Sequence, residues 1–103
     1  MVQPKQNGTS EGAKLRRLAM NPATELMFTQ RSGNQAEEMG VSRPDCLRII
    51  GSGRVIKSEN HGNEWRRWVQ GIDLDGNTVT LALTVVTTNS GTKRIVILDC
   101  ERD

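Results

Sequence analysis

The sequence is poor in the side chains that carry acid–base chemistry near neutral pH. It contains no tyrosine and a single histidine, His61. Because histidine is the side chain that changes charge near neutral pH, a general acid or base has few other candidates. One phenylalanine and two tryptophans are present, so the core must be mainly aliphatic. No catalytic motif stands out anywhere in the chain.

Cysteine is also scarce, and long apolar runs are missing. Cys46 and Cys100 stand at no spacing typical of metal ligands, and we expect both to be buried free thiols. The first residues lack the apolar core of a signal peptide, and no apolar run of about 18 residues occurs. The sequence therefore predicts a soluble cytoplasmic protein that does not contact a membrane.

The length of 103 residues predicts one domain, too small for a large internal cofactor cavity. We expect no cofactor and no metal. Residues 1–10 offer almost nothing to bury, which predicts a disordered tail before a domain at 11–103. The positive charge is concentrated at the same end. Residues 1–21 hold four basic and one acidic side chain, whereas residues 54–103 hold seven of each.

The first half of the domain is predicted to be helical. Ser42 is a natural N-cap and Pro44 suits a first turn, while Gly40 and the segment 51–53 are helix stops. The apolar run at 26–29 is either an edge strand or the lead-in to the next helix. The predicted helices cover residues 11–20, 32–39 and 44–50.

The second half alternates strands and turns. Asp75-Gly76 predicts a tight hairpin turn, and the last strand is apolar on both faces, which suits an interior position. The predicted strands cover residues 54–58, 64–73, 78–85 and 93–100. The pattern as a whole predicts an α+β fold. In it, two or three short N-terminal helices pack on one face of a four-stranded antiparallel β meander.

His61 lies in a predicted turn at 60–63 and is the first candidate for proton transfer. It is either catalytic or an exposed turn histidine. Metal binding together with Glu59 and Glu64 would require further ligands at helical or CxxC spacing, which the sequence does not offer.

The segment 64–68, Glu-Trp-Arg-Arg-Trp, is the most unusual in the chain. On a strand, Trp65 and Arg67 point to one face while Arg66 and Trp68 point to the other. We expect one tryptophan to lie in the core. The other stacks either on an RNA base or on a neighbouring arginine.

Several cations are predicted to lie over the sheet, where they can hold a phosphate backbone and stabilise the charge of a cleaved phosphodiester. They are Lys57, Arg66 or Arg67, Arg94 and Arg31. The alternative is that they are solvated strand charges. The glycine-rich segment 51–53 follows a helix and precedes a strand, the reverse of a phosphate-binding loop, so it is interpreted as a helix stop.

From Phe28 to Leu98 the order of residues resembles a family of small prokaryotic toxin-like domains of unknown function. That family is related in fold to the RelE, BrnT and MqsR messenger-RNA interferase toxins. The shared features are Phe28-Thr29, the helix end at 38–42, the helix at 44–50 followed by 53–55, then Trp65-Arg66, Gly71, Asp75-Gly76 and the two final apolar strands. The resemblance implies a RelE-like fold and a bacterial toxin–antitoxin function.

The resemblance further implies an endoribonuclease, free or ribosome-dependent, that transfers the phosphoryl group to the neighbouring 2′-hydroxyl without a metal. Lys57-Ser58 matches a Lys-Ser pair on a strand of MqsR-like toxins. The implied partners are RNA or the ribosome and a cognate antitoxin protein. The candidate catalytic residues are Lys57, His61 and Arg66, and the candidate RNA-binding residues are Arg31, Trp65, Arg67 and Arg94.

Two positions depart from the family pattern. Family members typically carry a histidine shortly after the Phe-Thr pair and an arginine before the Gly-Val corner. This sequence has Arg31 and Met39 there. The departure, together with a sheet of zero net charge and few acid–base groups, favours a second hypothesis. It is a non-catalytic RNA- or protein-binding module on the same scaffold.

Overall fold

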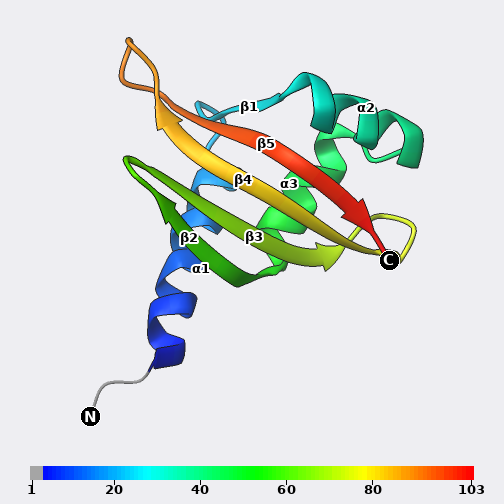
Figure 1. Ribbon diagram of the computed structural model, residues 1–103, viewed down its shortest axis with the longest axis horizontal. Coiled ribbons are helices and arrows are strands. Elements are labelled where there is room, and N and C mark those ends of the chain that lie inside the picture. Colours follow the sequence, from blue (N-terminus) through cyan, green and yellow to red (C-terminus); the bar gives the residue numbers. More distant parts are fainter. Residues whose placement is uncertain (1–3) are drawn as a thin grey trace.

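The computed structural model of the protein shows an α+β fold, which confirms the predicted class (Figure 1). It describes the backbone of residues 4–103 and the side chains of residues 11–103. The elements are α1 (Pro4–Met20), β1 (Glu25–Phe28), α2 (Gln30–Met39), α3 (Arg43–Ser52), β2 (Arg54–His61), β3 (Glu64–Ile72), β4 (Thr78–Thr87) and β5 (Lys93–Arg102). None of the helices within residues 4–103 has the length and apolar character that a bilayer crossing requires.

The sheet has five strands in the order β1-β5-β4-β3-β2, one more than predicted. β1 pairs in parallel with β5, and the other neighbouring strands are antiparallel. The added strand is the apolar run at 26–29. In it, buried Leu26 alternates with exposed Met27, so the segment can pair along β5 with one face inward. β5 therefore lies inside the sheet, as its apolar character predicted.

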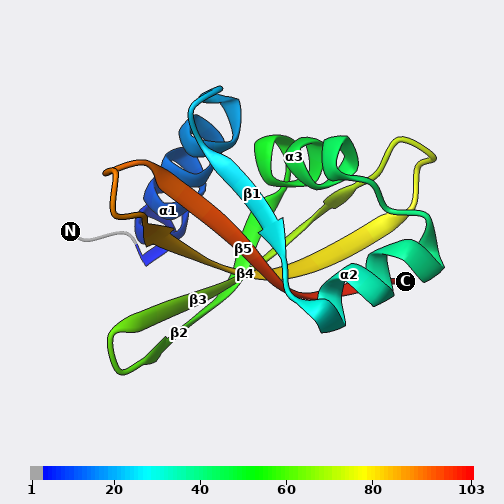
Figure 2. The same cartoon turned by 90° about the horizontal axis from the view of Figure 1, so that it is seen from above.

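Helices α1 and α3 pack against one face of the sheet, and both lie on the same side of it in Figure 2. Their apolar side chains share one core with the strands, including Leu15, Cys46, Ile49, Leu81, Leu83, Ile95 and Ile97. α2 lies beside β5 instead, so the prediction that the helices cover one face holds for α1 and α3 only. The opposite face, called the open face below, carries Lys57, Glu59, Arg66, Trp68, Thr84 and Arg94.

Helix α1 is longer than predicted. It begins at Pro4 and not at residue 11, so the tail expected at 1–10 is helical from residue 4 onward. Residues 1–3 lie outside the described part of the chain. Proline suits the first turn of a helix, because the N–H that it lacks would have no helical partner there. The helix ends at Met20, before Asn21-Pro22, as predicted.

Helix α3 is fixed at its start by a capping box, which confirms the predicted start at Ser42. The Ser42 hydroxyl accepts a hydrogen bond from the backbone N–H of Asp45, and Asp45 Oδ2 accepts one from the Ser42 backbone N–H. Asp45 Oδ1 accepts from the backbone N–H of Leu74 in the β3–β4 turn, 3.2 Å away. These hydrogen bonds, led by the one from the Ser42 backbone, hold the pKa of Asp45 below its ordinary value.

The end of α3 approaches β3 so closely that two glycines are required. A Cβ atom at Gly53 would lie 2.5 Å from the carbonyl oxygens of Ile49 and Gln70. One at Gly71 would lie 3.0 Å from the Ile49 carbonyl oxygen. Neither place accepts a methyl group without movement of the backbone. The helix runs through Gly51 and Ser52, two residues further than predicted, and ends at its cap Gly53, which also lets α3 rest directly on β3.

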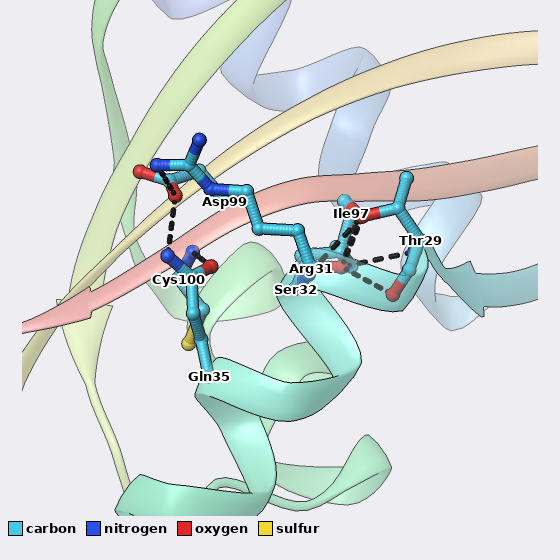
Figure 3. A network of polar contacts seen from close by, with 7 residues as sticks. All are labelled: Thr29, Arg31, Ser32, Gln35, Ile97, Asp99 and Cys100. Atoms are coloured by element: carbon cyan, nitrogen blue, oxygen red, sulfur yellow. Dashed lines mark hydrogen bonds and ion pairs between the residues drawn. The ribbon is translucent and has the colours of Figure 1, made fainter.

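Helix α2 covers the edge of β5 where β1 stops (Figure 3). The Ser32 hydroxyl donates to the carbonyl oxygen of Ile97, and Gln35 Oε1 accepts from the backbone N–H of Cys100, 3.0 Å away. Gln35 Nε2 also donates to Asp99 Oδ1 over 2.8 Å. Helix side chains thus satisfy backbone groups that an edge strand would otherwise leave open for pairing.

Both cysteines are free and buried, as predicted. Burial raises the pKa of the Cys46 thiol to about 12 and that of the Cys100 thiol to about 11. Because the thiolate is the reactive form of cysteine, neither side chain is suited to nucleophilic chemistry.

Candidate functional site

The three candidate catalytic residues lie on one face of the β2–β3 hairpin. The cross-strand pairs are Lys57 with Trp68, Glu59 with Arg66, and His61 with Glu64. Residues two apart on a strand share a face, so all of these side chains lie on the open face. His61 is the last residue of β2, next to a turn in which Gly62 has a φ of 73°. The hairpin therefore brings the predicted proton-transfer groups and a predicted phosphate-binding cation together.

Glu59 connects two of these residues. Its Oε2 lies 2.9 Å from Lys57 Nζ, and its Oε1 lies 2.9 Å from His61 Nε2. These contacts, the one with Lys57 first, hold the pKa of Glu59 below its ordinary value. A carboxylate bonded to one imidazole nitrogen orients the ring and leaves the other nitrogen free to exchange a proton.

Glu59 is the member of this group that the sequence interpretation missed, because it was considered there only as a metal ligand. The signal that finds it is the period of two along β2, which places Lys57, Glu59 and His61 on one face. No group of three or more histidine, cysteine, aspartate or glutamate side chains within the described residues is arranged to hold a metal ion.

Arg66 lies directly across the hairpin from Glu59 but contacts a residue of its own strand. Its Nε lies 2.6 Å from Glu64 Oε2, and 41% of its side chain is exposed. A guanidinium group has five N–H donors, so this contact leaves others available for an anion placed near His61.

Neither tryptophan is among the fully buried residues of the core, contrary to the prediction for one of them. Trp68 is partly buried on the open face, with Lys57 Nζ 4.6 Å from its ring centroid. Trp65 is 46% exposed, and the Arg67 guanidinium lies 5.4 Å from its centroid. Each indole thus stacks with a cation. Val69 holds the buried core position of β3, and the alternation of the strand places its neighbour Trp68 on the open face.

Arg67 and Trp65 lie on the opposite side of the hairpin, facing α1. Arg67 Nε lies 3.3 Å from Glu11 Oε1, and Ser58 Oγ donates to Glu11 Oε2 over 2.8 Å. The Arg67 side chain is only 22% exposed. The structure therefore does not bring these two RNA-binding candidates together with Lys57, and Arg67 instead links α1 to the sheet.

Arg94 and Arg31 lie at the other side of the sheet. Arg94 is on the open face, two strands across and two residues along from Arg66, about 12 Å away, and its Nη2 lies 2.8 Å from Glu25 Oε1. Arg31 projects from α2, where its Nη2 lies 3.3 Å from Asp99 Oδ1 (Figure 3). Arg94 thus borders the same surface as Arg66, whereas Arg31 lies beyond the edge of β5.

One property is common to the six candidates: each lysine or arginine forms an ion pair with a carboxylate, and His61 forms a hydrogen bond with one. The pairs are Arg31–Asp99, Lys57–Glu59, His61–Glu59, Arg66–Glu64, Arg67–Glu11 and Arg94–Glu25. Two of these ion pairs, Lys57–Glu59 and Arg66–Glu64, join residues that both lie in 54–103, whereas Arg67, Arg94 and Asp99 pair with residues outside that range. An anion that binds at these cations must compete with a carboxylate already in place.

Comparisons of the chain with protein-family models, curated proteins and solved structures found no match. The relationship implied by the resemblance in sequence therefore stays a prediction. The geometry of the side chains is what bears on function.

Proposed function

We propose that the protein is an endoribonuclease of the messenger-RNA interferase type with a RelE-like fold, and that its active site is the open face of the β2–β3 hairpin. The observation that carries the proposal is that Lys57, His61 and Arg66 share one face of one hairpin. The Glu59 carboxylate contacts both Lys57 and His61 there. A proton acceptor, a proton donor and a permanent cation are the groups that cleavage through a neighbouring 2′-hydroxyl requires.

In this mechanism His61 is the general base. With Nε2 donating to Glu59, Nδ1 takes the proton of the 2′-hydroxyl while the 2′-oxygen attacks the adjacent phosphorus. Arg66 donates to the non-bridging oxygens, where negative charge develops. Lys57 protonates the 5′-oxygen as the P–O5′ bond breaks. The products are a 2′,3′-cyclic phosphate and a 5′-hydroxyl, and solvent then restores both side chains to their starting protonation states.

The test is RNA cleavage by the purified protein, with and without ribosomes. His61→Gln and Arg66→Gln should each lower the cleavage rate by about a hundredfold or more. Both side chains are more than 40% exposed, so the variants should stay folded. Lys93→Gln, a change at an exposed cation outside the hairpin, should leave the rate unchanged. A substrate with a 2′-deoxyribose at the cleaved position should remain intact.

The enzyme proposal fails if RNA stays intact under both conditions and expression of the protein does not slow growth. A small antitoxin-like protein encoded in the neighbouring reading frame would support the toxin–antitoxin part of the proposal, with that protein as the partner.

The pairing of every cationic candidate with a carboxylate favours a second function, a non-catalytic RNA- or protein-binding module on the same scaffold. A paired cation is a weaker phosphate ligand, and a carboxylate beside it repels a phosphodiester. This function predicts that RNA, or a partner protein, is bound and recovered intact. RNA cleavage that disappears in Lys57→Ala or Arg66→Ala, with folding preserved, would exclude it.

A further inference from the structure

The outer surface of helices α1 and α3 differs in charge from the sheet. Neither the enzyme nor the binding-module proposal uses this surface. The two helices contact each other on one side of the sheet. Their cationic side chains with described positions, called the basic helical surface below, are Lys14, Arg16, Arg17, Arg43 and Arg48. Lys14 and Arg17 are three residues apart and are neighbours on the exposed side of α1.

The only acidic residues of the two helices are turned inward. Glu11, in α1, forms an ion pair with Arg67 and accepts a hydrogen bond from Ser58, both on the strands that face the helix. Asp45, in α3, is buried and accepts hydrogen bonds from Ser42 and from the Leu74 backbone. Both carboxylates of the helical layer are therefore hydrogen-bonded within the fold. The nearby Arg48 charge also attracts the Asp45 carboxylate, so the two acids compensate only part of the positive charge of the five helical cations.

The cations of this surface lack the ion pairs that characterise the sheet. Within the described residues, none of the five forms an ion pair with a carboxylate. Arg43 donates to the carbonyl oxygen of Leu26, which fixes its position and leaves its charge uncompensated. No acidic side chain exists in residues 1–10, so none can come from there.

We propose that the basic helical surface binds the phosphate backbone of RNA. Its positive charge is grouped on two adjacent helices, as is typical of surfaces that contact nucleic-acid phosphates. This surface is on the opposite side of the sheet from the open face of the β2–β3 hairpin, and the proposal does not depend on cleavage at that face. If both proposals hold, the helices hold the RNA while the hairpin acts on another part of it or on another strand.

The composition of the surface favours a phosphate backbone over bases or a lipid bilayer. Neither helix contains an aromatic residue, so unpaired bases have no side chain to stack on. The apolar residues of α1 face the core: Leu15 is buried, and Leu18 and Ala19 pack against it. Met20 alone is strongly exposed, which is too little apolar area for an interfacial membrane helix. The surface is therefore suited to the phosphate backbone of a duplex or folded strand, bound without regard to sequence, and an RNA duplex is the probe for the proposal.

The test measures binding of a fluorescently labelled RNA duplex by anisotropy, in about 50 to 200 mM salt. One variant combines Lys14→Gln, Arg17→Gln and Arg48→Gln, which are exposed and unpaired side chains. Its matched control combines Arg54→Gln, Lys93→Gln and Arg102→Gln, which are the remaining cations outside ion pairs within the described residues. Both variants remove the same charge, and circular dichroism checks their folding.

We expect wild-type binding to weaken steeply with salt. The helical variant should bind about tenfold or more weakly, and its log–log salt dependence should be shallower by about two to three. The control should bind within about threefold of wild type. Cleavage of a short single-stranded RNA, if present, should persist in the helical variant, which separates this proposal from the enzyme proposal.

Three results would overturn the proposal. The first is the absence of wild-type binding in about 50 mM salt, where non-specific phosphate contacts are strong. The second is equal weakening in the two variants, which would assign binding to net charge alone. The third is binding to phosphatidylserine vesicles, lost in the helical variant, with no binding of RNA. That result would assign the surface to anionic lipid.

Discussion

The open face of the sheet and the basic helical surface both carry cations, but they hold them in different ways. On the sheet, Lys57, Arg66 and Arg94 each contact a carboxylate within 3 Å. On the helices, the carboxylate of Glu11 pairs with Arg67 of the sheet, and that of Asp45 accepts a hydrogen bond from the Leu74 backbone. Within the described residues, three cations of the open face are thus paired and Arg54 is not, whereas all five cations of the basic helical surface lie outside ion pairs.

The difference matters because pairing orients a charged group while weakening its attraction for an external ligand. Glu59 fixes the position of His61, as a site of proton transfer requires. An arginine outside ion pairs has no carboxylate to displace before it contacts a phosphate, which favours backbone binding. The two surfaces are therefore suited to positioned chemistry and to electrostatic docking, respectively.

The largest expected effect on stability comes from disturbing the contact between helix α3 and strand β3. Gly53→Ala places a methyl group 2.5 Å from two carbonyl oxygens and should lower the free energy of unfolding by about 3 kcal/mol. Gly51→Ala is the matched control, since no atom lies within 4 Å of its Cβ position, and it should stabilise by up to about 1 kcal/mol. Urea unfolding measures both. Similar stability of the two variants would contradict the close approach of α3 to β3.

A smaller effect is expected at Asp45, one of the two inward carboxylates. Asp45→Ala should lower the free energy of unfolding by about 2 kcal/mol at neutral pH, because the helix cap and the bond to Leu74 are lost. The folded-state pKa of Asp45 lies below its ordinary value of 3.8. Its charge-dependent contribution is therefore complete above that value and is lost as the pH falls through the folded-state pKa.

The pH dependence of unfolding checks this assignment. The difference in unfolding free energy between wild type and Asp45→Ala should shrink below about pH 4. Glu37→Ala, at an exposed position of α2, is the control and should give a small difference across the range. A difference for Asp45→Ala that grows on acidification would show that the ionised carboxylate does not stabilise the fold.

The contacts of Glu11, which join helix α1 to the sheet, should contribute less to the free energy of unfolding than Asp45 does. Glu11→Gln weakens contacts with Arg67 and Ser58 and should lower the unfolding free energy by about 1 kcal/mol, since the pair is partly exposed. Glu25→Gln breaks the more exposed ion pair with Arg94 and should change the unfolding free energy by less than about 0.5 kcal/mol. If the two variants lose equal stability, Glu11 does not anchor α1.

The parts of the fold that local sequence signals specify were predictable. The Ser42 cap and the interior strand β5 follow from capping and apolar pattern, whereas the face shared by Lys57 and His61 did not, because the strand was predicted to end at residue 58 with His61 in a turn. The sequence did not decide whether the apolar run at 26–29 is an edge strand or the lead-in to a helix. The four residues of β1 pair with β5, which is far along the chain, and a short apolar run does not specify its partner.

The charge pairing was not predictable for a related reason. Arg67 pairs with Glu11 and Arg94 with Glu25, partners that are distant in sequence and meet only through the packing of α1 and the pairing of β1. The alternation of β3 separates Trp65 from Trp68, but it does not show that the face of Trp68 is left uncovered by helices or that Trp65 stays half exposed beside Arg67. Counts of charged residues along the chain locate an excess of positive charge, but they do not show which cations lie outside ion pairs in the folded protein.

The smallest expected effect on stability, and the sharpest test of the comparison, is to release one sheet cation from its partner. Glu64→Gln removes the carboxylate from Arg66, which should change the unfolding free energy by less than about 0.5 kcal/mol because both side chains are well exposed. The freed guanidinium should strengthen RNA binding by about threefold to tenfold at low salt and steepen its salt dependence by about one.

Glu37→Gln makes the same charge change on α2 and is the matched control, with an expected gain of less than about twofold. Equal gains in the two variants would mean that net charge, and not the pairing of Arg66, limits binding on the open face. Where cleavage is measured, a stronger-binding Glu64→Gln variant that cleaves more slowly would assign Glu64 the role of positioning Arg66 for catalysis, because the freed cation would then bind RNA in unproductive geometries.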